Sequence, residues 1–279
     1  MFDYEEDFAP FDEDEYRLQD AYFKQALQDI TDLYEKDKSK VYFTRQLQVQ
    51  LEKKYFHWIT DDALRYLHRT DKLRLIKERL SEETPLHLYI HPSNRYPKRA
   101  IKEIKKLVME YSTELVTRSC GHRAELLFGN SLMMNGFRLL GQNVNELQGK
   151  KWNKTGHNLD FILERDGIFY GCEIKNTLGY IEKEEMTIKL DICKYLGLAP
   201  LFIMRFTPKP YFKEILERGG ITILFKYQLY EFSQRPLVDK IKNVLELPVD
   251  CPLAIEQGTM ERMLKLHKKN VNSKRNHMK

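Results

Sequence analysis

The sequence predicts a mixed α/β (α+β) chain in two parts: a smaller domain of helices and a β-ribbon, then a central mixed sheet flanked by helices. Strand-like segments at 159–164 and 168–175, joined by Asp166-Gly167, predict a β-hairpin in the second part. Three amphipathic segments near the N-terminus predict the helices of the first part. Two prolines and several turn-forming residues at 91–97 indicate the linker between them.

The composition is that of a cytoplasmic protein that does not enter a membrane. The chain has 279 residues, of which 42% are hydrophobic, and a mean hydropathy of −0.57. No apolar run approaches the length of a membrane span, and the first fifteen residues are acidic, unlike a signal peptide. The cysteines form no Cys-x-x-Cys pair, so we expect buried thiols rather than a zinc site or disulfides. They are Cys120, Cys172, Cys193 and Cys251.

Charge is distributed unevenly along the chain. Residues 1–39 hold thirteen Asp and Glu against four Lys and Arg, so residues 40–279 carry a net charge of about +14. A basic surface of this kind attracts phosphate backbones, although a merely solvated surface has the same composition. We expect residues 1–19 to be a disordered, solubilising acidic tail, and 253–279 to be a basic tail able to contact DNA without specificity.

The first part begins with three short predicted helices. The apolar positions of the first are Tyr22, Ala26, Ile30 and Leu33. The second spans 44–54, and the third spans 60–70 with Thr60 as its N-cap. Residues 86–90 are strand-like and complete a β-ribbon.

This order over residues 20–95, and the segment 60–73 in particular, resembles a winged helix-turn-helix domain. The resemblance implies that the third helix enters the major groove of double-stranded DNA. Winged helices also mediate protein contacts, and the same basic side chains suit a solvated helix face. The side chains expected to reach bases or phosphates are Arg65, His68, Arg69, Lys72 and Arg74.

A linker helix is predicted at 96–119, after the proline-containing segment. Its start is crowded with lysine and arginine, which are either solvated or aligned along DNA. Its predicted apolar stripe consists of Ile101, Ile104, Val108, Tyr111 and Leu115.

The hairpin turn fixes which residues face each other across its two strands. With Asp166-Gly167 as a two-residue loop, Asp160 lies opposite Glu173, and Lys175 shares their face of the sheet. The opposite face is apolar, so a functional side is separated from a packed side. The pairs that this register also predicts are Arg165 with Ile168, Leu163 with Tyr170, and Phe161 with Cys172, while Ile174 adds to the apolar side.

Two carboxylates opposite each other destabilise a sheet unless a cation, a shared proton or solvent compensates them. A divalent cation such as Mg²⁺ suits this pair best, because Mg²⁺ is held by one or two carboxylates, waters and phosphate oxygens. Lys175 then lies beside the cation, where an ammonium group can hold an attacking water and offset charge on phosphorus.

A third acid, Glu125, lies on a predicted helix at 121–135, in line with Phe128 and Leu132. Taken alone, it suits a surface or salt-bridged acid. The remaining elements predicted for this part are strand 137–140, helix 182–196, strand 201–206, helix 211–218, strand 221–225 and a peripheral helix within 235–252.

Together, Glu125, Asp160 and Glu173-Ile-Lys175 resemble the E…D…(D/E)-x-K signature of the PD-(D/E)-x-K nuclease superfamily. The likeness covers residues 121–206, where the predicted order of elements is also that of the family core: helix, three antiparallel strands, helix, strand. It implies a restriction-endonuclease-like core within 120–252. The Gln-x-x-x-Tyr of some relatives has only Asp191-x-x-x-Tyr195 as its nearest match, and Leu159 replaces the usual proline before Asp160.

The resemblance implies that the catalytic residues are Glu125, Asp160, Glu173 and Lys175. Asp160 and Glu173, with the backbone carbonyl of Ile174, would hold Mg²⁺, for which Mn²⁺ would substitute. Glu125 would complete a second metal site or act through water, and Lys175 would orient the nucleophilic water.

The sequence therefore predicts a Mg²⁺-dependent DNA endonuclease of restriction or defence type, which acts on double-stranded DNA as a homodimer. A structure-specific repair or recombination nuclease resembling junction resolvases shares every one of these residues. A non-catalytic winged-helix DNA-binding regulator, or a nuclease acting on RNA, remains a further alternative. Because no glycine loop that would cradle phosphates is present, no nucleotide cofactor is expected.

Overall fold

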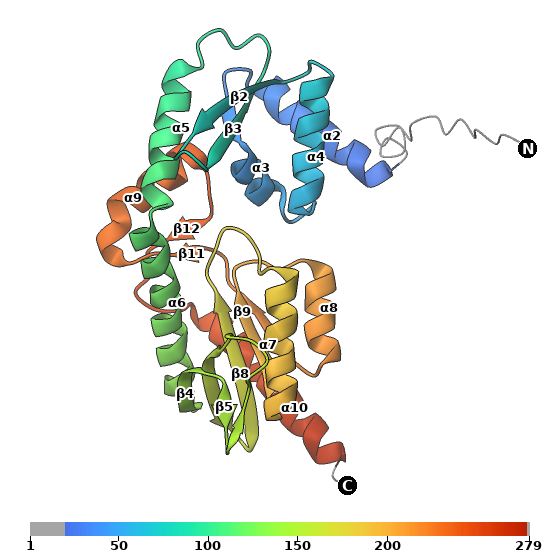
Figure 1. The fold of residues 1–279 in the computed structure, drawn as a ribbon, viewed down its shortest axis with the longest axis vertical. Helices are drawn as coiled ribbons and strands as arrows, with labels where there is room; N and C mark the ends of the chain where they lie inside the picture. The colour runs from blue at the N-terminus through green and yellow to red at the C-terminus, as the bar shows by residue number, and fades with distance from the viewer. Residues whose placement is uncertain (1–19, 278–279) are drawn as a thin grey trace, which may run out of the picture. The chain divides into compact units, whose positions relative to one another are not determined.

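The computed structural model describes residues 20–277, which form two compact units of mixed α/β structure (Figure 1). The first unit runs to Met109 and includes Leu245–Leu247; the second comprises Glu110–Val244 and the chain from Pro248 onwards. The predicted acidic tail at 1–19 lies outside the described residues.

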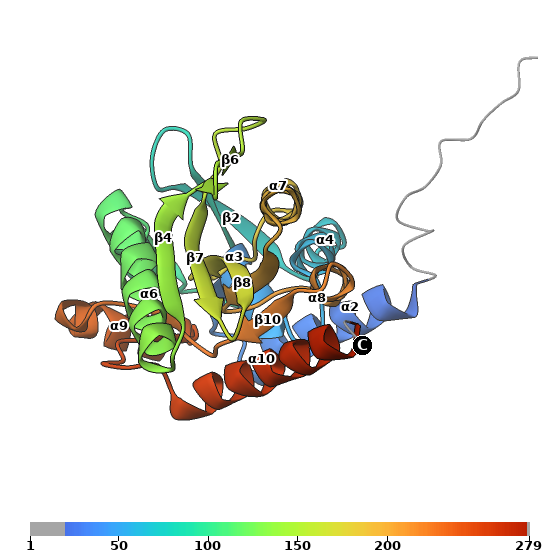
Figure 2. The same cartoon turned by 90° about the horizontal axis from the view of Figure 1, so that it is seen from below.

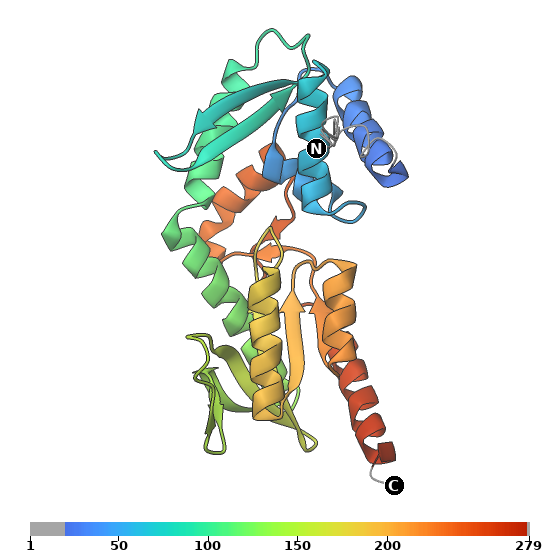
Figure 3. The ribbon, with the colours of Figure 1, turned by 45° about the vertical axis from the view of Figure 1, so that its right-hand side comes forward.

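The first unit has the predicted order of three helices followed by a β-ribbon, with one additional short strand (Figure 3). Its three strands form an antiparallel sheet in the order β1-β3-β2. Its elements are α2 (Ala21–Lys36), β1 (Val41–Phe43), α3 (Thr44–Leu51), α4 (His57–Arg69), β2 (Arg74–Arg79), β3 (Pro85–Ile90) and α5 (Lys98–Tyr111) up to Met109.

The apolar faces of α2, α3 and α4 pack together as the core of this unit. Ala26, Leu47 and Leu64 are fully buried there. The predicted N-cap at Thr60 is wrong, because α4 begins one turn earlier, at His57. Ile59 already packs in the core, so the apolar pattern extends the helix toward the N-terminus.

The predicted linker helix at 96–119 is two helices. The first of them, α5, ends at Tyr111, and α6 (Glu114–Met134) begins after Thr113, whose side-chain oxygen accepts a hydrogen bond from the Val116 N–H at 3.4 Å. A hydroxyl that caps a helix N-terminus in this way starts a new helix. Leu115 is therefore 80% exposed in the first turn of α6 and does not extend the stripe of α5.

The second unit is built on a mixed five-stranded sheet with the strand order β10-β9-β8-β7-β4. Strands β4, β7 and β8 are antiparallel, whereas β9 and β10 run parallel to β8. The strands are β4 (Arg138–Val144), β7 (Leu159–Arg165), β8 (Ile168–Lys175), β9 (Ala199–Met204) and β10 (Ile221–Leu224).

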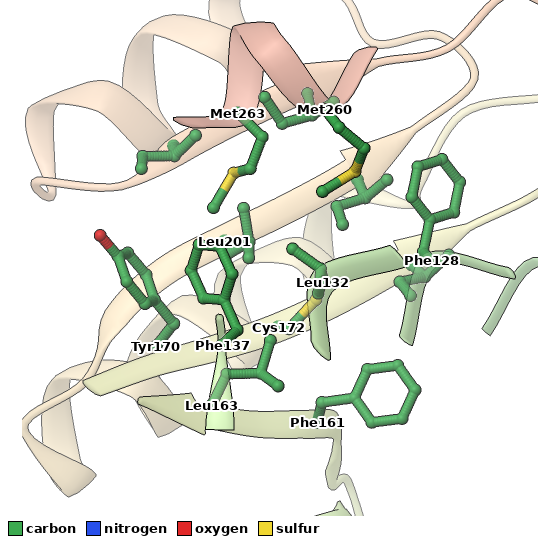
Figure 4. Packing of buried hydrophobic residues seen from close by; sticks show 14 of the residues in the cluster. Phe128, Leu132, Phe137, Phe161, Leu163, Tyr170, Cys172, Leu201, Met260 and Met263 are labelled. Atoms are coloured by element: carbon green, nitrogen blue, oxygen red, sulfur yellow. The ribbon is translucent and has the colours of Figure 1, made fainter. Parts of the chain in front are cut away.

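Helices cover both faces of this sheet (Figure 2). On one face, α6 and α10 (Gln257–His277) pack on a buried apolar cluster, part of which is shown in Figure 4. On the other face, α7 (Lys183–Leu196) and α8 (Lys209–Glu217) pack on two smaller clusters. The remaining elements are the ribbon of β5 (Glu146–Leu147) and β6 (Lys150–Lys151), the pair β11 (Gln228–Leu229) and β12 (Val249–Asp250), and α9 (Arg235–Lys240), which continues into a π-helical turn (Ile241–Leu245).

Several predicted elements of the second unit have different bounds in the structure. The helix that carries Glu125 begins seven residues earlier than predicted, at Glu114, and the following strand extends to Val144. Most of the predicted basic tail is the helix α10. Met260 and Met263 bury one side of this helix in the core, which explains why a basic segment folds (Figure 4).

None of the helices in the described chain, residues 20–277, is long and apolar enough to cross a membrane.

Candidate active site

The hairpin has the predicted register. Arg165 faces Ile168, Leu163 faces Tyr170, and Phe161 faces Cys172. Asp166 and Gly167 both have positive φ angles, 50° and 74°, as the tight turn that joins two twisted strands requires. At the other end of the hairpin, the Ile174 N–H donates to Asp160 Oδ2 at 2.6 Å, which holds the Asp160 carboxylate against the strand of Glu173.

The predicted apolar side of the hairpin is buried against α6 and α10. The predicted functional side is also covered, because α7 packs across it. Glu173 is consequently only 3% exposed. A carboxylate that has lost this much water requires a partner.

Helix α7 supplies partners for both charged residues of Glu173-Ile-Lys175. Lys189 Nζ lies 2.6 Å from Glu173 Oε2, and Glu185 Oε1 lies 2.6 Å from Lys175 Nζ. Residues four apart share a helix face and residues two apart share a strand face, so the two ion pairs form side by side. Lys189 also donates to the Asn158 carbonyl at 2.6 Å, just before the strand that carries Asp160.

Neither Glu185 nor Lys189 was predicted as a site residue. A signal was available for Lys189, because it lies within the apolar stripe of α7 between Met186 and Cys193. A lysine in a buried stripe indicates a buried acid nearby.

The nearest match to the family's Gln-x-x-x-Tyr faces elsewhere. Asp191 forms an ion pair with Arg218 at 2.7 Å, and the ring of Tyr195 packs edge-on against Trp152.

The Asp160 carboxylate acts electrostatically on the other two acids of the predicted motif. Burial and the Asp160 carboxylate raise the pKa of both Glu125 and Glu173, whereas Lys189 lowers that of Glu173. Burial also raises the pKa of Asp160, and the Ile174 N–H opposes this shift.

Asn176 fixes α6, the helix of Glu125, to the end of β8. Its side-chain amide donates to the carbonyls of Cys120 and Leu229, each at 2.8 Å. Its side-chain oxygen accepts the Leu229 N–H at 2.8 Å. This buried residue follows Lys175 directly, so it couples the position of Glu125 to that of the strand motif.

The charges of this site suit a divalent cation. Lys189 pairs with Glu173 and Glu185 pairs with Lys175. Burial raises the pKa of Asp160 and of Glu125, and a cation bound beside either carboxylate would favour its ionised form. Among residues 20–277, no three His, Cys, Asp or Glu side chains are grouped as a ready metal site. Mg²⁺ does not need such a group, because it binds through one or two carboxylates and completes its shell with water and phosphate.

Four of the five predicted DNA-binding residues, Arg74 among them, are exposed on the first unit. Arg65 and Arg69 lie on α4, and Lys72 lies in the turn that follows it. Arg65 forms an ion pair with Asp61 at 2.7 Å, one helical turn away.

Two of the predicted residues, His68 and Arg74, contact the backbone of their own unit. His68 Nδ1 lies 3.3 Å from the Leu73 carbonyl and is half-buried. Arg74 donates to the Asn94 carbonyl at 2.9 Å. His68 thus stabilises the turn between α4 and β2, and its side chain is less accessible to DNA than predicted.

No protein-family model matches this chain, and no curated protein matches it either. Its function is therefore inferred from the residues themselves.

Proposed function

We propose that this protein is a Mg²⁺-dependent DNA endonuclease of the PD-(D/E)-x-K type, with an N-terminal winged-helix domain that binds double-stranded DNA. The observation that carries the proposal is the pairing of Asp160 with the Glu173-Ile-Lys175 strand, where the Ile174 N–H holds the Asp160 carboxylate. Two opposed acids with a lysine two residues later are the groups that metal-assisted hydrolysis of a phosphodiester uses.

The order of elements around the site supports a restriction-endonuclease-like core. Helix α6, the antiparallel strands β4, β7 and β8, helix α7 and the parallel strand β9 follow one another in the chain. The family core has the same sequence of helix, three strands, helix and strand. The motif residues Glu125, Asp160 and Lys175 lie on the first helix and the hairpin, as the family pattern requires.

The first unit supports a winged-helix assignment in the same way. Its helices and strands follow the order helix, strand, helix, helix, strand, strand, and β1 closes the sheet by pairing with β3. In such domains the third helix contacts DNA. The exposed cations Arg65, Arg69 and Lys72 on and after α4 are suited to phosphate contact.

Asp160 and Glu173, with the Ile174 carbonyl and Glu125, would hold Mg²⁺, and Mn²⁺ would substitute for it. When bound, the cation lowers the pKa of water and neutralises charge on the phosphate. Lys175 would orient the attacking water and offset the negative charge that develops on the phosphate oxygens. Glu185, which holds the Lys175 ammonium, sets its direction.

The water oxygen would form a new bond to phosphorus while the bond from phosphorus to the 3′ oxygen breaks. The products are a 5′ phosphate and a 3′ hydroxyl, the 3′ oxygen taking up a proton. Cleavage of both strands of a duplex requires two such sites, which a homodimer would supply.

The test is cleavage of defined DNA by the purified chain with Mg²⁺ or with EDTA. Methylated and unmethylated plasmid, phage DNA, branched junctions and a matched RNA duplex separate restriction, structure-specific and RNA nucleases. We expect metal-dependent cutting of DNA that Asp160→Ala abolishes while DNA binding remains. If the wild-type chain binds DNA but cuts none of these substrates, it is instead a non-catalytic DNA-binding protein.

A further inference from the structure

Lys189 joins two parts of the site that come from different strands. Its ammonium lies 2.6 Å from Glu173 Oε2, on β8, and donates to the Asn158 carbonyl at 2.6 Å. Asn158 lies two residues before Asp160 and directly before β7. One side chain on α7 therefore fixes both the Glu173 carboxylate and the chain segment that leads into Asp160.

These contacts fix one oxygen of each opposed carboxylate. Oε2 of Glu173 accepts from Lys189, and Oδ2 of Asp160 accepts from the Ile174 N–H at 2.6 Å. A carboxylate oxygen pair can accept from a protein donor through one atom and bind a cation through the other. Hydrogen bonds of this kind orient metal ligands in many proteins.

Packing alone does not account for a lysine at this position. Lys189 is 5% exposed and lies among the buried side chains Met186, Leu190 and Cys193. Burying an ion pair loses solvation that the attraction between the charges only partly returns, and apolar residues of similar size in place of both ions are often as stable. The Lys189 ammonium therefore has a role in the arrangement of the site.

We propose that Lys189 is a positioning residue of the metal site: it holds Glu173 and the start of β7 so that Asp160 and Glu173 present oxygens to one divalent cation. This role rests on the proposed function. It assigns α7 a part in cation binding as well as in covering the sheet.

The test is Mn²⁺ binding by isothermal titration calorimetry, with folding followed by circular dichroism. Lys189→Met should weaken binding about 10- to 100-fold, the usual cost of losing a group that orients a metal ligand. Lys189→Arg, which keeps a cation with donors to both partners, should recover most of that loss. Leu190→Ala is the matched control, because it destabilises the same helix through a side chain buried in the apolar cluster of Phe202, Met204 and Ile215, and its dissociation constant should stay within about threefold of wild type.

Equal Mn²⁺ affinity in wild type and Lys189→Met would overturn the positioning role alone. Equal weakening by Lys189→Met and Leu190→Ala would also overturn it, because loss of stability would then explain the effect. If Lys189→Met does not fold, Lys189→Gln is measured against the same thresholds. A wild-type chain that neither binds Mn²⁺ nor cuts DNA would overturn the proposed function itself.

Discussion

Lys189 and Glu173 form an ion pair of 2.6 Å in which both side chains are almost completely buried. The pair links α7 to β8 at the acid of the strand motif. The neighbouring pair of Lys175 with Glu185 repeats this link two residues later on the strand. Helix α7, which covers the predicted functional side of the hairpin, therefore supplies the ion-pair partners of both Glu173 and Lys175.

Breaking the buried pair should destabilise the fold strongly. Lys189→Met leaves Glu173 buried without its cation, and we expect a loss of about 3–5 kcal/mol in the free energy of unfolding. Lys194→Met, an exposed position on the same helix, should change it by less than about 0.5 kcal/mol. Urea unfolding followed by circular dichroism measures both. A loss below about 1 kcal/mol for Lys189→Met would mean that the buried pair does not form.

The double variant Lys189→Met with Glu173→Gln separates the two causes of this loss. It removes the buried negative charge together with its partner, so it should be more stable than Lys189→Met alone. If the double variant loses as much stability as the Lys189→Met and Glu173→Gln single variants together, the two residues do not interact.

The stability of the metal-free protein should fall as pH rises from about 4.5 to 8. Burial raises the pKa of Asp160, Glu125 and Glu173 in the folded state, so the folded protein binds more protons than the unfolded chain in this range. Stability from these groups is complete below their unfolded pKa and is lost as pH rises through the folded one. Each unit of pKa shift contributes on the order of 1 kcal/mol.

Asp160→Asn provides the control for this pH dependence. It removes one titrating acid and relieves the repulsion on Glu125 and Glu173, so its unfolding free energy should vary less with pH. Chemical unfolding at pH 5 and pH 8 in EDTA gives both slopes. Identical slopes in wild type and Asp160→Asn would show that the site does not carry the pH dependence.

Substitutions in the first unit should separate phosphate contacts from structural residues. Arg65→Ala and Lys72→Ala should each lower the slope of log affinity against log salt by about 0.9, because each removes one phosphate contact. His68→Ala should leave that slope unchanged, since its imidazole contacts the Leu73 carbonyl. Fluorescence anisotropy with duplex DNA at several salt concentrations measures these slopes. The reverse pattern would assign DNA contact to another surface.

Asn176→Ala should lower both stability and Mn²⁺ affinity. It leaves the Cys120 and Leu229 carbonyls and the Leu229 N–H without their partner, at about 1–3 kcal/mol for each buried group left unsatisfied. It also releases the helix of Glu125 from β8. Thermal unfolding and calorimetry with Mn²⁺ measure the two effects, and unchanged Mn²⁺ affinity would show that Asn176 does not position the site.

The hairpin was predictable because its information is local. Asp166-Gly167 fixes the turn, and the turn fixes the pairs from Arg165–Ile168 to Phe161–Cys172. This register also brings Asp160 to the second strand, where it accepts from the Ile174 N–H. The basic C-terminal segment was harder to predict. The sequence showed a helical pattern at Met260 and Met263. The many basic residues nevertheless favoured the prediction of a tail, whereas the segment is a helix that packs on the sheet.

The contribution of α7 depends on how a helix approaches a sheet, which the order of residues along the chain does not specify. Asp191 and Tyr195 match a family spacing but lie on another side of the helix. Lys189 lies on the side that meets Glu173. Which residues of α7 contact the acids of the strand motif is therefore determined by tertiary packing, and motif spacing does not predict it.

The central claim is tested most directly by the rate of Mg²⁺-dependent plasmid cleavage by wild type and Lys175→Met, each normalised to DNA binding. We predict that Lys175→Met lowers the cleavage rate about 10²- to 10³-fold with binding within threefold of wild type, because it removes a group that stabilises charge in the transition state. Cleavage at an equal rate by both proteins, or the absence of Mg²⁺-dependent cleavage by wild type, would contradict the account.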